Sequence, residues 1–126
     1  SHQWAIASVG AIVHGVDLEL IEKRAPVFLK EAFSATEIKQ LKDYAKTSNI
    51  AEDVVSTLLF SAKEALLKLI GSGLKGGLKQ IALKEIANPS PDNGPTHLQL
   101  TLTYKTKDYL ILAILFDNYV LTAATA

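Results

Sequence analysis

Apolar residues recur at helical spacing through residues 53–70, and this stretch carries the clearest secondary-structure signal in the chain. A helix brings positions three and four apart onto one side, so the apolar positions form one face. A narrow polar stripe on another face consists of Thr57, Ser61, Glu64 and Lys68. Gly71 and Gly73 follow the last apolar position and are expected to end the helix. The pattern predicts one long amphipathic helix.

A second helix is predicted to begin after Ser34. Ser34 and Glu37 have the spacing of a capping box, in which each side chain accepts from the other's backbone N–H. The helix is expected to run through Tyr44 and to be broken by residues 46–49. Residues 21–29, which include Arg24 and Pro26, are expected to form a linker.

Short apolar runs bounded by turn residues predict β-strands on both sides of these helices. Two are expected at residues 4–9 and 11–19, and four more at residues 79–87, 97–104, 109–116 and 119–122. Hairpin turns are expected at 106–108 and 117–118. The order β-β-α-α-β-β-β-β predicts an α+β fold in which the helices pack on an antiparallel sheet.

The bulk composition bounds the class of protein. The 126 residues suffice for one domain over residues 1–126 with its own core. Thirteen basic residues balance thirteen acidic ones, which argues against a nucleic-acid partner. The chain has no cysteine, so disulfides and thiolate metal sites are excluded. No run reaches the roughly 20 apolar residues of a membrane span, so a membrane partner is not expected and cytoplasmic localisation is favoured.

The chain contains no methionine, not even at its first position. A translation product begins with methionine, so the sequence is expected to be a processed, trimmed or engineered piece. Ser1 and His2 are then either native residues or the remnant of a tag.

Three acidic residues are the candidates for chemistry. In the predicted strand Asp17 and Glu19 share one face, while Val16 and Leu18 share the other. Two neighbouring carboxylates repel each other and call for a positive charge between them. If Glu64 of the long helix meets them, the three carboxylates make a site for a hard cation such as Mg²⁺. Lys68, one helical turn beyond Glu64, can then hold a phosphate oxygen.

Each of these features also has a simpler interpretation. Asp17 and Glu19 alone fit solvated charges on a strand, and Glu64 with Lys68 fits an ordinary surface ion pair. The glycine-rich residues 71–77 lack the spacing of a phosphate-binding P-loop and are better explained as a helix stop and turn. The combination therefore carries more weight than any single part.

Two segments resemble motifs of the 4′-phosphopantetheinyl transferase superfamily. Gly15-Val-Asp-Leu-Glu19 resembles the first motif, usually Gly-Ile-Asp-Ile-Glu, and Phe60-Ser-Ala-Lys-Glu-Ala-Leu-Leu-Lys68 resembles the second. The resemblance covers essentially the whole chain. It implies an enzyme that moves the phosphopantetheine arm of coenzyme A onto a serine of an acyl or peptidyl carrier protein and releases adenosine 3′,5′-bisphosphate.

The same resemblance implies a role for each matching residue. Asp17, Glu19 and Glu64 match the magnesium ligands, and Glu64, or a water that it positions, is implied to deprotonate the serine. Lys68 and Lys63 match contacts to the pyrophosphate of coenzyme A. The catalytic residues are then Glu64 and Lys68. Ser1 and His2 resemble a Ser-His pair near the 3′-phosphate of the nucleotide.

The superfamily contains two types, and the sequence favours one of them. In the surfactin-synthetase or enterobactin-synthetase type, two similar halves of one chain hold coenzyme A between them. The smaller acyl-carrier-protein synthase type is a single half that trimerises. The Asp-x-Glu pattern and the missing methionine favour the C-terminal half of the larger type, which would pair with an absent N-terminal half.

Two other functions stay open at this point. One is a non-catalytic or incomplete half-domain that acts in oligomerisation, as a pseudo-dimer or homo-oligomer, or in carrier-protein binding. The other is an unrelated magnesium-dependent enzyme that handles phosphate.

Overall fold

The computed structural model describes residues 15–71, 77–88 and 97–125. One strand and three helices come first: β1 (Gly15–Leu20), α2 (Pro26–Ala32), α3 (Ala35–Ser48) and α4 (Glu52–Ile70). A short 3₁₀ turn and four strands follow: η1 (Leu78–Gln80), β2 (Ile81–Ala87), β3 (His97–Tyr104), β4 (Lys107–Phe116) and β5 (Tyr119–Ala124). Among these described residues, no helix has the length and apolar character needed to cross a membrane.

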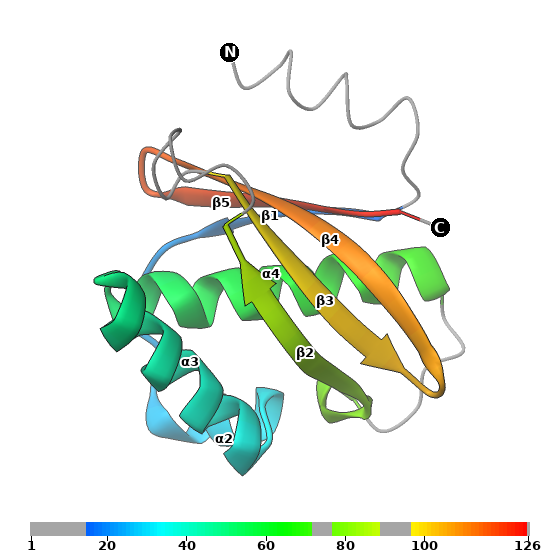
Figure 1. Cartoon of the computed structure of the whole chain (residues 1–126), viewed down its shortest axis with the longest axis horizontal. Coiled ribbons are helices and arrows are strands. Elements are labelled where there is room, and N and C mark those ends of the chain that lie inside the picture. Colours follow the sequence, from blue (N-terminus) through cyan, green and yellow to red (C-terminus); the bar gives the residue numbers. More distant parts are fainter. Residues whose placement is uncertain (1–14, 72–76, 89–96, 126) are drawn as a thin grey trace.

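The strands form one five-stranded sheet in the order β1-β5-β4-β3-β2. Every neighbouring pair is antiparallel, and β1 lies beside β5 with Gly15 opposite Ala124 and Leu20 opposite Tyr119. The helices lie on one side of this sheet (Figure 1). The predicted α+β fold with helices on an antiparallel sheet is confirmed.

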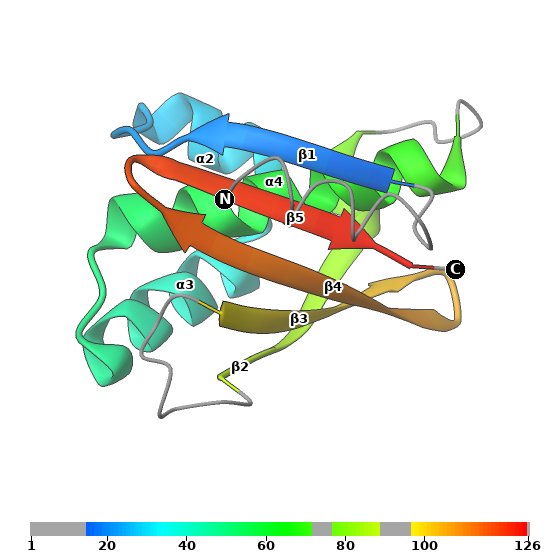
Figure 2. The ribbon, with the colours of Figure 1, turned by 90° about the horizontal axis from the view of Figure 1, so that it is seen from above.

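Helix α4 forms the centre of the core. It runs beneath β1, β5 and β4, which Figure 2 shows from above. β1 and β5 are far apart in the sequence and neighbours in space, so this strand pair joins the first and last strands of the described residues over α4. The apolar side chains of α4 without any solvent exposure are Val55, Leu58, Leu59, Ala62, Ala65 and Leu66.

The predicted helix boundaries agree with the structure at the start of α3 and in α4 but not elsewhere. The predicted break over residues 46–49 is wrong for its first three residues, because α3 continues through Ser48 and ends at Asn49, which has a left-handed backbone. Ser34 forms the predicted capping box with Glu37, and α4 differs from the predicted range by one residue. The predicted linker over residues 21–29 is wrong, because α2 begins there at Pro26. Proline has no N–H to lose in a first helical turn and its fixed φ suits that position, so it begins a helix here instead of preventing one.

One predicted hairpin turn is shifted and the other is confirmed. Tyr104 pairs with Lys107, so the turn between β3 and β4 consists of Lys105 and Thr106. The turn at residues 117–118 is confirmed, with Phe116 paired to Tyr119. The predicted strand over residues 4–9 lies outside the described residues.

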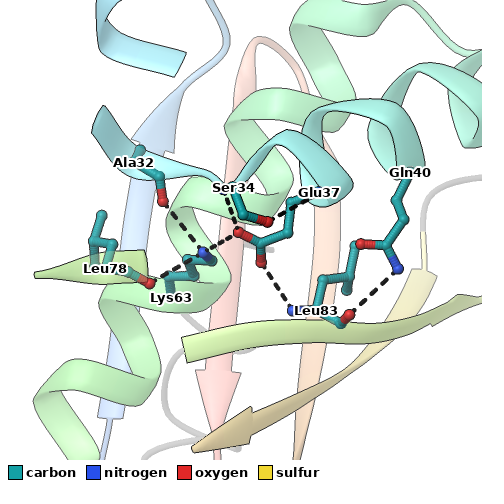
Figure 3. A network of polar contacts seen from close by, with 7 residues as sticks. All are labelled: Ala32, Ser34, Glu37, Gln40, Lys63, Leu78 and Leu83. Carbon is teal, nitrogen blue, oxygen red and sulfur yellow. Dashed lines mark hydrogen bonds and ion pairs between the residues drawn. The ribbon is translucent and has the colours of Figure 1, made fainter. Parts of the chain in front are cut away.

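The outer edge of β2 is covered by α3. Leu83 donates its backbone N–H to Glu37 Oε2 at 2.8 Å, and its carbonyl accepts from Gln40 Nε2 at 3.3 Å (Figure 3). Since β2 is an edge strand, these side chains take the place of a further strand at Leu83.

Candidate functional site

A glycine lets β1 approach α4 closely enough to form a site. A Cβ atom at Gly15 would lie 2.1 Å from the carbonyl oxygen of Ala65 and 2.9 Å from the backbone N of Leu69. No side chain fits in that space. Because side chains alternate along a strand, Asp17 and Glu19 share the face of Gly15 and are directed toward α4, whereas Leu18 on the other face is 49% exposed.

Asp17 and Lys68 form the centre of the site. Lys68 Nζ donates to Asp17 Oδ1 at 2.9 Å and to the carbonyl oxygen of Val16 at 3.0 Å. The Asp17 side chain is only 6% exposed, and its second oxygen, Oδ2, is buried and has no hydrogen-bond partner while the neighbouring acids are ionised. A buried carboxylate oxygen without a partner is costly, so one side of Asp17 is stabilised and the other is not.

The acids around Asp17 influence one another. Burial, a hydrogen bond with the Asp17 carboxyl and repulsion from Asp17 and Glu64 raise the pKa of Glu19 to about 7, against a smaller lowering by Arg24. A hydrogen bond between two carboxyl groups exists only while one of them is protonated. It therefore favours the protonated form of Glu19 and raises its pKa. Burial and repulsion from Asp17 also raise the pKa of Glu64, and Lys68 opposes this. The site holds more negative charge than its own cations offset.

The structure brings the predicted acids into one electrostatic cluster but does not converge them on a point. In the described part of the chain, no three acidic or histidine side chains are arranged to hold a metal ion as they stand. Lys68 occupies Asp17 Oδ1, where a shared ion was expected. The donor set still fits a hard cation, because carboxylate oxygens are the ligands that Mg²⁺ prefers and Asp17 Oδ2 is buried and unpartnered.

Lys63 does not take part in this site. Its side chain is fully buried, and its ammonium donates to Glu37 Oε1 at 2.7 Å, to the Ala32 carbonyl at 3.2 Å and to the Leu78 carbonyl at 3.1 Å (Figure 3). An ammonium has three protons, and these three acceptors use all of them. The predicted contact between Lys63 and the pyrophosphate of coenzyme A is therefore not supported by the structure, which gives Lys63 a role in the core.

The Lys63–Glu37 pair joins most of the elements that surround α4. Glu37 Oε1 also accepts from the backbone N of Ser34 at 2.9 Å, and Oε2 accepts from Leu83. The pair therefore connects the end of α2, the start of α3, η1 and β2 to one position on α4. Burial lowers the pKa of Lys63, and Glu37 opposes that shift. The side chain of Lys63 is directed toward α3. Glu64, the next residue of α4, is then directed toward β1 and Asp17.

Arg24 is a neighbour of the site that the sequence analysis placed in a linker. Its guanidinium lies 5.4 Å from the centre of the Phe28 ring and 5.6 Å from that of Phe60. It donates to Glu22 at 3.0 Å and to the Leu20 carbonyl at 3.1 Å. The only sequence signal was its position a few residues after the strand acids. Ser1 and His2, predicted near the 3′-phosphate, lie outside the described residues.

Comparison with known proteins assigns the class. Residues 14–124 match the family model described as the 4′-phosphopantetheinyl transferase superfamily, and the chain belongs to that superfamily. Phosphopantetheinyl transfer is therefore its class of activity, and it is an enzyme, as predicted.

One curated relative shows where in the superfamily the similarity lies. The chain is 32% identical over 101 residues to the holo-[acyl-carrier-protein] synthase of Wolbachia pipientis subsp. Culex pipiens (strain wPip). The match spans 80% of this chain and 77% of the relative. The predicted assignment to the C-terminal half of a surfactin- or enterobactin-type enzyme is not confirmed, since this relative bears the name of the smaller type.

Proposed function

We propose that this chain transfers the 4′-phosphopantetheine arm of coenzyme A to a serine hydroxyl of an acyl carrier protein in a magnesium-dependent reaction. The membership in the superfamily and the similarity to a holo-[acyl-carrier-protein] synthase support the substrates. The observation that carries the proposal is the buried Asp17, which has one unpartnered oxygen and lies among Glu19, Glu64 and Lys68. Acids and one lysine in a cluster are the side chains needed to hold a cation and a diphosphate.

Asp17, Glu19 and Glu64 are the residues that would hold Mg²⁺. The bound ion would supply positive charge against the negative charge of the diphosphate. The three carboxylates repel one another, and a cation bound between them would relieve that repulsion. This repulsion therefore favours binding of the ion.

The side chains of this chain then have two tasks. Glu64, or a water that it positions, accepts the proton of the serine hydroxyl. The serine Oγ forms a bond to the phosphorus that carries the pantetheine, and the bond from that phosphorus to the bridging oxygen breaks. Adenosine 3′,5′-bisphosphate leaves with the bridging oxygen. Lys68 lies one turn beyond Glu64 and offsets the negative charge on the diphosphate.

The test is a mass measurement on the carrier protein. The chain, coenzyme A, Mg²⁺ and an apo acyl carrier protein are incubated, and the carrier is expected to gain the mass of the phosphopantetheine arm. Glu64→Gln is expected to reduce the rate at least about 100-fold, since general-base catalysis contributes that much. Asp17→Asn is expected to reduce the rate because it removes a charged oxygen from the cation site. Glu52→Gln, an exposed glutamate of the same helix, is the matched control and is expected to keep the full rate.

Transfer that continues undiminished in a folded Glu64→Gln variant is incompatible with the proposed role of this carboxylate.

A further inference from the structure

The Lys68 ammonium is bound by the kind of ligands that a metal ion takes. Its two partners are a carboxylate oxygen of Asp17 at 2.9 Å and the carbonyl oxygen of Val16 at 3.0 Å. Carboxylate and backbone carbonyl oxygens are also standard ligands of hard divalent cations. The lysine and a divalent ion are therefore suited to the same place beside β1.

One ammonium does not balance the charge at this place. Asp17, Glu19 and Glu64 act on one another, and Asp17 Oδ2 is buried without a partner even while Oδ1 binds Lys68. Arg24 is the other nearby cation, and its hydrogen bonds go to Glu22 and the Leu20 carbonyl. A divalent ion offers twice the charge of the lysine and can bind several oxygens at once.

The lysine is also the partner that is free to move. Lys68 is 52% exposed and lies in the last turn of α4, on a flexible four-carbon stem. Asp17 is 6% exposed and is held in a strand that is closely packed against α4. Rotation of side-chain bonds alone takes the Lys68 ammonium off Asp17 into solvent, whereas Asp17 cannot leave without moving β1.

We infer that Lys68 and a divalent cation compete for the same oxygen of Asp17, so that binding of the ion releases Lys68 toward the solvent and the diphosphate. This inference rests on the proposed function, because it assigns a second role to a residue of the same site. Lys68 is the resident counter-ion of Asp17 before the ion binds and becomes available to a phosphate group afterwards. The order of binding follows, with the divalent ion first and the diphosphate second.

The first test measures thermal stability with and without Mg²⁺ and without coenzyme A. Lys68→Gln is expected to lower Tm in the absence of Mg²⁺, because Asp17 loses its counter-ion. Saturating Mg²⁺ is expected to remove at least half of that deficit, since the wild type loses the same contact when the ion binds. By linkage, Lys68→Gln then requires several-fold less Mg²⁺ for half-saturation than the wild type.

The matched control is Lys84→Gln. Lys84 also forms an ion pair with an aspartate, Asp108, at 2.6 Å, but it is exposed and lies on β2. Its substitution is expected to leave the Mg²⁺ response as in the wild type.

A second measurement follows Lys68 itself. Acetylation of lysine side chains with an amine-reactive ester, read by mass spectrometry of peptides, reports how free each ammonium is. Lys68 is expected to react several-fold faster in saturating Mg²⁺ than without it, while Lys84 reacts at one rate under both conditions.

The outcomes separate the inference from the proposed function. A wild type that is stabilised by Mg²⁺ while Lys68 stays equally protected, or while the Lys68→Gln deficit persists, overturns the inference alone. A wild type whose Tm does not respond to Mg²⁺ overturns both the inference and the magnesium part of the proposed function.

Discussion

Lys63 and Glu37 come from different helices and form an ion pair of 2.7 Å in which the side chains are 0% and 4% exposed. Their remaining hydrogen bonds are to the backbone, at Ala32 and Leu78 for the lysine and at Leu83 and Ser34 for the glutamate. A buried pair with all its hydrogen bonds formed costs little while it is complete. Removal of one partner leaves an uncompensated charge in the core.

Lys63→Met is therefore expected to lower the free energy of unfolding by about 3–5 kcal/mol, the usual cost of breaking a buried ion pair from one side. Urea denaturation followed by circular dichroism measures it. The control is Lys84→Met, which breaks an exposed ion pair and is expected to leave the midpoint nearly unchanged. A Lys63→Met midpoint equal to that of the wild type contradicts the structural role assigned to this lysine.

Gly15→Ala is expected to destabilise the chain by about 1–3 kcal/mol, the range for overpacking, because the new methyl group meets the backbone of α4. The backbone carbonyl of Ala65 cannot turn aside as a flexible side chain does. Thermal denaturation measures the loss. Leu18→Ala in the same strand is the comparison, since that side chain is 49% exposed and its loss is expected to cost less.

Stability is expected to fall as the pH rises from about 4.5 to about 7, because the pKa of Glu19 lies at about 7 in the folded chain against a model-peptide value of 4.5. Below this window Glu19 is protonated in both states, so its charge carries no penalty. Above it, the folded chain holds an unfavourable carboxylate. Tm measured across the window in the wild type and in Glu19→Gln tests this, since the variant lacks the titrating group.

Mg²⁺ is expected to reduce this pH dependence, because a bound cation favours the ionised carboxylates. If Glu19→Gln shows the same slope of Tm against pH as the wild type, the pH dependence has another source.

Ser34→Ala is expected to cost about 1 kcal/mol of stability, the typical cost of losing an N-cap side chain. Ser34 Oγ accepts from the backbone N of Glu37 at 3.1 Å, and the substitution leaves that donor at the start of α3 without its partner. Chemical denaturation measures the change, and Ser34→Asp, which retains a capping oxygen, is expected to restore most of it. An alanine variant as stable as the wild type speaks against a contribution from this cap.

The fold was predictable where local chemistry decides it. The apolar period of α4, the capping box at Ser34 and the turn at residues 117–118 are each readable within a few positions, and all three are present in the structure. Helix α2 lies within the expected linker, and the signal for its start is Pro26, because a proline in the first turn is compatible with a helix.

The site was predictable only in part. Strand alternation placed Asp17 and Glu19 on one face, and the spacing along α4 placed Lys68 one turn from Glu64. The role of Lys63 was expected from the resemblance alone, whereas the structure places its side chain in the core. Its partner, Glu37, is 26 residues away, and no local pattern reports a contact over that distance.

Lys63 and Glu64 are neighbours in the chain but lie in different places. Lys63 lies in the interior, and Glu64 lies in the cluster of acids. A descendant of this protein that had abandoned transfer would still need the lysine in order to fold. A lysine at this position in another sequence therefore indicates that the fold is kept and does not by itself indicate an active enzyme.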